Sequence, residues 1–175
     1  LPWIDQGRLP VLGGLLGKGA WSPLESTIPP HTPCAWSSFI TGKNPGKHGV
    51  FEFSEPIEGS YEFRFTNSAS RHGESLWGNL SAAGKRVGVV NVPMTYPPEE
   101  VNGYLISGLD TPHEYSRFMH PAEIRTDLDD AAIRYRIDLQ HMGNMRSDER
   151  RRAMLRDLND MESERTKAFQ LLSER

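Results

Sequence analysis

The residue best placed for chemistry in this 175-residue sequence is Thr32. Thr32-Pro33 predicts the start of a helix, because a hydroxyl caps a helix well and proline is tolerated at the first helical position. A helix N-terminus offers unpaired N–H groups and the positive end of the dipole, which favour a phosphate group. Pro33 has no N–H, so Cys34 and Ala35 are the nearest expected amide donors. A threonine hydroxyl needs a base or a metal ion to become a nucleophile.

Two further patterns follow Thr32 at short intervals. Thr41-Gly42 is typical of a helix end, where glycine adopts a left-handed conformation. Pro45-Gly46-Lys47-His48-Gly49 then has the composition of a tight turn. A lone Thr32 would be interpreted as a helix cap, and it is the order of the three patterns that favours a catalytic role.

The segment from Ser26 to Gly49 resembles the nucleophile region of the type I phosphodiesterase/nucleotide pyrophosphatase family, within the alkaline phosphatase superfamily. The run from Gly84 to Pro98 is similar to bacterial members of this group. The resemblance extends from Leu1 to about Pro121. It implies a hydrolase of phosphate esters, with diesters favoured, that forms a phospho-threonine intermediate on Thr32.

The same resemblance implies a metal cofactor. Members of the family hold two zinc ions, one on the threonine oxygen and one on the transferred phosphoryl group. Only Thr32 corresponds to a metal ligand in this sequence, and the remaining Asp and His ligands are expected outside it. Leu1 is not a methionine, and the helical pattern reaches Arg175 without a stop signal. We therefore expect an N-terminal fragment that is inactive alone.

One position departs from the family pattern. Nucleotide pyrophosphatases carry a phosphate-binding asparagine shortly after the His-Gly turn, whereas this sequence has Phe53 at the matching place. The difference weakens the case for a nucleotide substrate. Glu52 and Asn91 are candidates for the missing contact, although no motif supports either of them.

Other reactive side chains have simpler interpretations. Cys34 lacks the Cys-x-Pro-x-Arg pattern of sulfatases and is expected to be a small buried residue. The segment from Gly42 to Lys47 is one residue short of a phosphate-binding P-loop. His48 is expected to fix the turn, and His31 to face solvent, with a contact to the substrate as the alternative. The remaining histidines, which have no metal-ligand spacing, are His72, His113, His120 and His141.

The rest of the sequence predicts an α/β fold, as a partial alkaline phosphatase-like core with a C-terminal helical segment. The nearly continuous apolar run Val87–Val92 is typical of a strand buried on both faces of a parallel sheet. Residues 104–107 predict a second strand, and a hairpin is expected around Glu58-Gly59. Together with the flanking helices, these strands favour a layered architecture.

Helical patterns flank the strands. Residues 74–83 predict an amphipathic helix with Leu76, Trp77 and Leu80 on one face. From Ser147 onward the sequence predicts one long helix that packs an apolar stripe on the sheet. The stripe consists of Met154, Leu155, Leu158, Met161, Phe169 and Leu172.

Two parts of the chain are expected. Residues 1–121 would form the N-terminal part of an alkaline phosphatase-like catalytic domain. Residues 122–175 would form a helical insertion or continuation that is truncated at its end.

Composition narrows the class of partner. The net charge of -3, from 20 basic and 23 acidic residues, provides no electrostatic case for nucleic acid. The sequence lacks the apolar run of roughly 18 residues that a membrane helix needs. Its single cysteine excludes an intrachain disulfide and, with no recognisable signal peptide, favours a cytoplasmic location. The expected partner is a small phosphate ester, and the oligomeric state stays open.

Two other functions remain open from the sequence. A phosphomutase or phosphoglycerate mutase-like transferase of the same superfamily would share the nucleophile and differ in the phosphoryl acceptor. A non-catalytic binding protein would lack the Asp and His metal ligands altogether.

Overall fold

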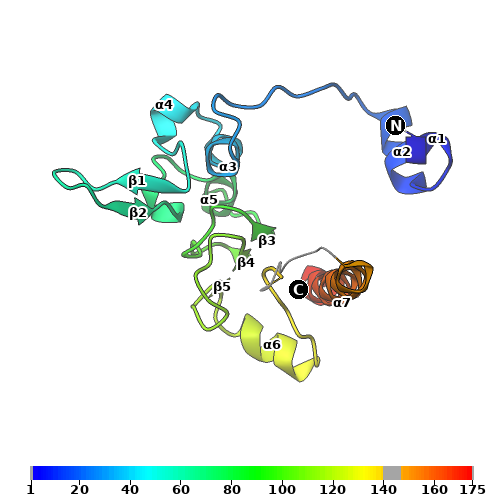
Figure 1. The fold of residues 1–175 in the computed structure, drawn as a ribbon. Coiled ribbons are helices and arrows are strands. Elements are labelled where there is room, and N and C mark those ends of the chain that lie inside the picture. Colours follow the sequence, from blue (N-terminus) through cyan, green and yellow to red (C-terminus); the bar gives the residue numbers. More distant parts are fainter. Residues whose placement is uncertain (1, 140–146, 175) are drawn as a thin grey trace.

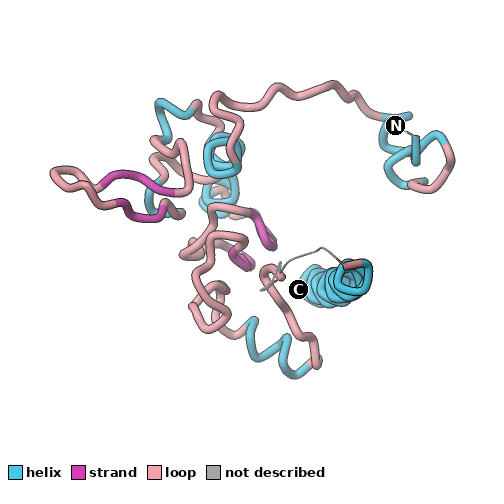
Figure 2. The backbone as a smooth tube through the Cα atoms, viewed as in Figure 1, coloured by secondary structure: helices cyan, strands magenta, loops and turns pink. Residues whose placement is uncertain are grey.

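The computed structural model describes residues 2–139 and 147–174, and Figure 1 and Figure 2 show their arrangement. The helices are α1 (Pro2–Asp5), α2 (Pro10–Lys18), α3 (Thr32–Thr41), α4 (Pro45–His48), α5 (Leu76–Ala82), α6 (Ile124–Asp130) and α7 (Asp148–Ser173). The strands are β1 (Ser54–Pro56), β2 (Phe63–Phe65), β3 (Val87–Val92), β4 (Gly103–Ser107) and β5 (Met119–His120). A short 3-10 helix covers Ser68–Ser70.

A three-stranded sheet organises the main body. Its order is β3-β4-β5, with β4 parallel to β3 and antiparallel to β5. In Figure 1, α3 and α5 lie on one side of the sheet, and α6 and α7 on the other. A mixed sheet flanked by helices confirms the predicted α/β fold and is consistent with part of an alkaline phosphatase-like core.

Two neighbouring residues of β4 supply the centres of two cores. Leu105 and Ile106 are both fully buried, and because successive side chains of a strand point to opposite faces, they enter different layers. Leu105 packs in a cluster with Ile40 of α3 and Trp77 of α5. Ile106 belongs to the cluster that α6 and α7 cover. Each such side chain contributes about 1.5–3 kcal/mol when it leaves water.

β3 is less buried than the sequence predicted. Val89 is its one buried residue, and β4 is its only partner strand in the part of the chain that the structure describes. The register shifts between Val90 and Val92, where Asn91 has a φ of 58°. The apolar run predicted the strand correctly, and the prediction that both its faces are buried is wrong for the described residues.

The expected hairpin is present. β1 and β2 are antiparallel, with Ser54 opposite Phe65 and Pro56 opposite Phe63, and the loop between them contains Glu58-Gly59. The helix predicted over 74–83 is α5, but only one of its apolar side chains faces the core. Trp77 is buried, whereas Leu76 and Leu80 are exposed, so the predicted apolar face is covered only in part.

The long C-terminal helix begins where predicted. Ser147 is its N-cap, and the serine hydroxyl accepts a hydrogen bond from the Arg150 N–H. Met161 and Leu172 of the predicted stripe are buried, together with Ala168, which the sequence did not single out. The other side chains of the stripe stay partly or largely exposed, so α7 covers the sheet with a narrower face than expected.

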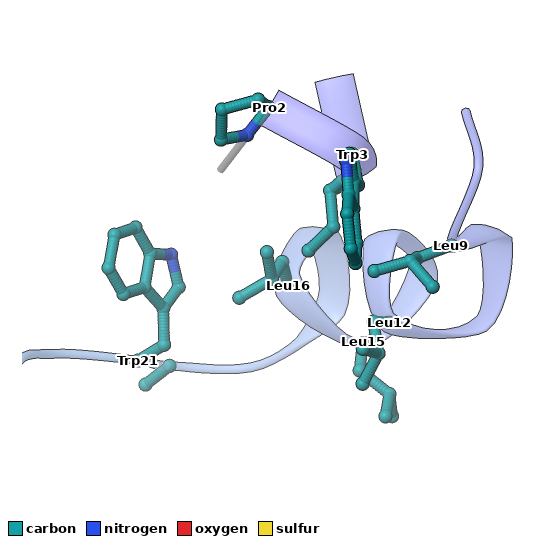
Figure 3. Close-up of a pocket in the computed structure, with 9 residues that line it drawn as sticks. Pro2, Trp3, Leu9, Leu12, Leu15, Leu16 and Trp21 are labelled. Carbon is teal, nitrogen blue, oxygen red and sulfur yellow. The ribbon is translucent and has the colours of Figure 1, made fainter. Parts of the chain in front are cut away.

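The N-terminal helices form a separate unit. α1 and α2 lie at the far end of an extended segment, away from the sheet (Figure 1). None of their described residues is buried. An apolar cavity of about 590 Å³ opens between them and the start of that segment (Figure 3). It is lined by Pro2, Trp3, Ile4, Leu9, Leu12, Leu15, Leu16, Ala20 and Trp21. Across the described ranges, every helix is too short or too polar to cross a lipid bilayer.

Candidate active site

α3 places Thr32 at its first residue. The first helical hydrogen bond runs from the Ala35 N–H to the His31 carbonyl oxygen (2.9 Å), so His31 is the N-cap. The prediction that Thr32 caps the helix is therefore wrong, because the helix starts one residue earlier than the capping pattern implied. Thr32 is half-buried, and its hydroxyl makes no capping hydrogen bond. Its oxygen is therefore free of competing partners among the described residues.

The amide donors expected beside Thr32 are less available than predicted. The Ala35 N–H already bonds to His31. Cys34 is fully buried, which confirms the prediction of a small buried residue but places its amide away from solvent. Because Pro33 has no N–H, the first turn offers a phosphate group only the N–H of Thr32. A phosphate held here needs further donors from outside this turn.

The far end of α3 is fixed by its own side chains. The Thr41 hydroxyl donates to the Ser37 carbonyl (2.7 Å) and accepts from the Lys43 N–H (3.2 Å). Gly42 has a φ of 65°, a left-handed conformation that glycine adopts without strain, and its N–H bonds to the Ser38 carbonyl (2.9 Å). The Thr-Gly pair thus ends the helix as the sequence predicted.

His48 locks the turn that follows against α3. Its ring is fully buried, Nδ1 accepts from the Val50 N–H (3.1 Å), and Nε2 lies 2.9 Å from the Ser38 hydroxyl. Since Nδ1 accepts, the neutral ring carries its proton on Nε2. Burial, helped by the nearby charge of Arg71, lowers the pKa of His48. Both ring nitrogens are occupied, as expected for a residue that fixes the turn.

Glu52 contacts the residue beside Thr32. Its Oε2 lies 2.5 Å from His31 Nδ1, and its Oε1 accepts from the Phe53 N–H (2.9 Å). The Phe53 N–H and, after it, the charge of His31 lower the pKa of Glu52, so the carboxylate stays ionised. An ionised carboxylate only accepts hydrogen bonds, so Glu52 does not replace the phosphate contact of an asparagine. Its position instead brings a negative charge next to the first turn of α3.

Asn91 has a different environment. It lies at the bulge of β3, in a groove that also includes Phe39 and Arg165. Its Oδ1 is buried and has no hydrogen-bond partner among the described residues. No contact joins it to Thr32, so the structure gives it no part in the candidate site.

Sequence reasoning missed a buried polar network behind the site. Glu99 accepts from Arg71, from the Ser75 hydroxyl (2.5 Å) and from Trp77 Nε1 (3.1 Å). Arg71 is almost fully buried and also donates to the Met94 carbonyl (2.8 Å). Burial lowers the pKa of Arg71, against the opposing effect of Glu99. The partners are separated by more than twenty residues in sequence, so no local pattern could have revealed the network.

Asp110 fixes the loop after β3. Its carboxylate accepts from the N–H groups of Met94 (2.9 Å), Thr95 (3.3 Å) and Tyr96 (2.9 Å). Burial raises the pKa of Asp110, and the three amides oppose the shift. The only sequence signal for this loop is the similarity of the run from Gly84 to Pro98 to bacterial relatives, which did not identify Asp110.

The described residues do not assemble a metal site. No group of three or more His, Cys, Asp or Glu side chains gathers within residues 2–139 and 147–174. His31 and Glu52 lie near Thr32 but pair with each other and belong to no such group of three, so these residues alone do not fit the two zinc ions that the resemblance implies. His141, one of the scattered histidines, lies outside the described residues.

The sequence was compared with known protein families, curated proteins and solved structures. A family model for type I phosphodiesterase / nucleotide pyrophosphatase proteins matches residues 2–171. Neither a curated protein nor a solved structure matches the chain. The match includes the first turn of α3, the His48 turn, the sheet and most of α7, and so spans both parts expected from the sequence.

Proposed function

Because the chain belongs to the type I phosphodiesterase/nucleotide pyrophosphatase family, a family of phosphoric ester hydrolases in the alkaline phosphatase superfamily, we propose that it provides the nucleophile for hydrolysis of phosphodiesters. The nucleophile is the Thr32 hydroxyl. The reaction passes through a phospho-threonine intermediate, and the substrate is a small phosphate ester.

The observation that carries this proposal is the state of Thr32 in the fold. Its hydroxyl has no partner among the described residues, while the helix behind it is held by Thr41, Gly42 and the buried ring of His48. An unpaired hydroxyl on a rigid support suits attack on a bound phosphorus atom, because the support removes the entropy cost of orienting it. A threonine that served only as a cap would have its hydroxyl bonded to the helix.

The proposed chemistry has two displacements at phosphorus. In the first, Thr32 Oγ forms a bond to phosphorus, the bond from phosphorus to the alcohol oxygen breaks, and the threonine proton is lost. The leaving alcohol takes up a proton. In the second, water attacks phosphorus, the Thr32 Oγ–phosphorus bond breaks, and the threonine hydroxyl regains its proton. The products are an alcohol and a phosphomonoester, as required for a diester.

Zinc is part of the proposal, with Thr32 as one ligand. A metal ion would lower the cost of deprotonating the hydroxyl and neutralise charge on the phosphoryl group. The described residues supply no other group of metal ligands, so the ligands that complete the site are expected outside this chain. We propose that the 175-residue chain alone lacks turnover, since a catalytic zinc site generally needs about three protein ligands.

Trapping the intermediate tests the function. Acid-quenched full-length protein, turned over with zinc and a nitrophenyl phosphodiester, should carry a phosphoryl group that still bears the second ester substituent on the peptide that contains Thr32 when analysed by mass spectrometry. Cys34→Ser is the matched control, since Cys34 lies in the same turn and is buried. This phosphoryl adduct on any other residue, or a Cys34→Ser variant without activity, would exclude Thr32 as the nucleophile.

Two further assignments accompany this proposal. We propose that residues 1–121 are the N-terminal part of the catalytic domain and that residues 122–175 continue it as a helical segment. A cytoplasmic location is proposed on the single cysteine and on the lack of a recognisable signal peptide in this sequence.

A further inference from the structure

One edge of β3 lies in a groove. Among the described residues β3 is the end strand of the order β3-β4-β5, so the side of β3 away from β4 faces no other strand. A groove of about 650 Å³ is lined by residues 88–92 of β3. Val89 packs in the layer of α3 and α5, and Val90 in the layer of α7, so a groove that reaches both lies at the edge of the sheet. Such an edge is a template for pairing with another strand.

The two walls of this groove differ in chemistry. α3 and α5 contribute the exposed apolar side chains of Phe39 and Leu76. The α7 wall carries Glu162 and Arg165, which form an ion pair with each other. Between the walls, Asn91 Oδ1 is buried without a hydrogen-bond partner in the described residues. The groove therefore fits an extended segment that brings backbone N–H donors, apolar side chains on one face and charges on the other.

The β1–β2 hairpin has these properties. All three residues of β2 are exposed, and in Figure 1 the hairpin extends from the body in the direction away from β3 and α7. Phe63 and Phe65 share one face of β2 and are 68% and 84% exposed. Arg64 lies on the opposite face and pairs with Glu55 of β1. A two-stranded hairpin is only marginally stable in water, so a surface that covers its aromatic face would stabilise it.

The charges of the hairpin and of the groove are complementary. When β2 lies along β3 with its aromatic face toward α3 and α5, Arg64 points toward α7. Arg64 then lies opposite Glu162, and Glu55 opposite Arg165, so that four charges alternate in sign. The hairpin extends away from the groove of its own copy, so this contact requires a second copy of the chain.

We propose that β2 of one copy of this chain adds to the β3 edge of a second copy, so that the hairpin fills the groove. The contact joins two different surfaces, which makes it heterologous, and each pair of copies retains one free hairpin and one free groove. Association is therefore head-to-tail and continues beyond a dimer as the concentration rises. This inference is independent of the role proposed for Thr32.

The mass of the 175-residue chain in solution is the first test. Sedimentation from about 1 µM to about 500 µM should show an average mass that rises past twice the 19.7 kDa of one copy without reaching a plateau. A mass that stays at one copy, or a plateau at a closed dimer, would overturn the proposal.

Mixing two damaged chains separates docking from a general loss of structure. The paired change Phe63→Thr with Phe65→Thr removes the aromatic face and keeps residues that favour a strand. Phe39→Lys places a charge in the apolar wall of the groove, at an exposed helix position. Each variant alone should associate at least about tenfold more weakly than the parent chain. An equimolar mixture should form a heterodimer and no larger species, because it contains one intact groove and one intact hairpin per pair. If the mixture stays monomeric, the hairpin does not bind the groove.

Charge reversal tests the placement of β2. Arg64→Glu and Glu162→Arg should each weaken association by about tenfold, and the two changes in one chain should restore it. Tyr115→Thr and Leu155→Lys, at exposed positions outside both surfaces, are the controls and should leave association unchanged. A combined variant that stays weak, or a control that weakens association, counts against the proposal. If the full-length protein stays monomeric while the 175-residue chain associates, another segment of the polypeptide occupies the groove, and the proposal is wrong.

Discussion

α2 and α3 are helices of nearly equal length in very different surroundings. α2 has nine residues and α3 has ten, and both begin with a proline in the first turn. None of the α2 residues is buried, whereas α3 buries Pro33, Cys34, Ser37 and Ile40. Both helices carry this local start signal, but of the two only α3 packs against described residues distant in sequence. The proposed nucleophile lies on the helix that tertiary contacts hold.

Among substitutions in these two helices, the largest effect is expected on turnover, from a change at Thr32 of α3. Thr32→Ala is expected to reduce turnover of the full-length protein at least about 10³-fold, because no covalent intermediate can form. Since the Thr32 hydroxyl makes no capping hydrogen bond, the free energy of unfolding should change by less than about 0.5 kcal/mol. Thr32→Ser should keep partial activity.

Steady-state kinetics and urea unfolding measure the two quantities. If Thr32→Ala lowers the free energy of unfolding by more than about 1 kcal/mol, the Thr32 hydroxyl caps α3 in solution, contrary to the structure.

The polar network behind α3 should show the largest effect on stability. Glu99→Ala leaves the buried Arg71 without its partner, and breaking such a pair costs about 3–5 kcal/mol. We expect a cost at the lower end of this range, about 3 kcal/mol, because Glu99 is itself partly exposed. Urea unfolding of the 175-residue chain provides the value. Glu100→Ala, the exposed neighbour, is the control, and equal midpoints for the two variants would show that the network contributes nothing.

His48 should give the α3 region a pH dependence that α2 lacks. Burial holds the folded-state pKa below the ordinary value of 6.5, so the unfolded chain binds the proton first as pH falls. The stabilising contribution is complete above 6.5 and is lost as pH drops towards the folded-state pKa. His48→Gln should cost about 1–2 kcal/mol at about pH 7.5 through its lost hydrogen bonds.

The sign of the pH effect is checked by unfolding at about pH 7.5 and about pH 5.5, on either side of the ordinary histidine pKa. The difference in stability between the parent chain and His48→Gln should shrink at the lower pH. A difference that grows on acidification would mean that His48 is protonated in the folded state.

The smallest effect is expected in α2. Leu15→Ser changes an exposed side chain and should alter the free energy of unfolding of the main body by less than about 0.5 kcal/mol. Ile40→Ser, in α3, is the matched change at a buried position and should be far more costly. If Leu15→Ser proves as costly as Ile40→Ser, α2 packs against the main body in solution and the comparison fails.

The sequence predicted those features that depend on neighbouring residues. The Thr41-Gly42 helix end, the His48 turn, the hairpin at Glu58-Gly59 and the start of the long helix at Ser147 each depend on hydrogen bonds within a few residues, and all are present. The predicted N-cap of α3 was Thr32, whereas the observed N-cap is His31, one residue earlier. Proline is tolerated throughout the first turn of a helix, so Pro33 does not distinguish these two positions.

Features that depend on distant partners escaped prediction. Nothing near Glu99 indicates that Arg71, Ser75 and Trp77 converge on it. Likewise, the contact between His31 and Glu52 exists only because the His48 turn brings the two segments together. The apolar run of β3 predicted a strand without revealing which side would be covered, since apolar periodicity carries no information about the neighbouring strand.

The extended segment between α2 and α3 has a consequence for protease digestion. Among residues 20–30 the structure shows no strand or helix, and the side chains of Trp21, Leu24 and Ile28 are exposed. A protease can draw such a chain into its cleft without unfolding anything else, and Lys18 provides trypsin with a site just before it. Brief digestion should therefore release α1 and α2 as a peptide, while Thr32 stays on the resistant body, attached to it by α3.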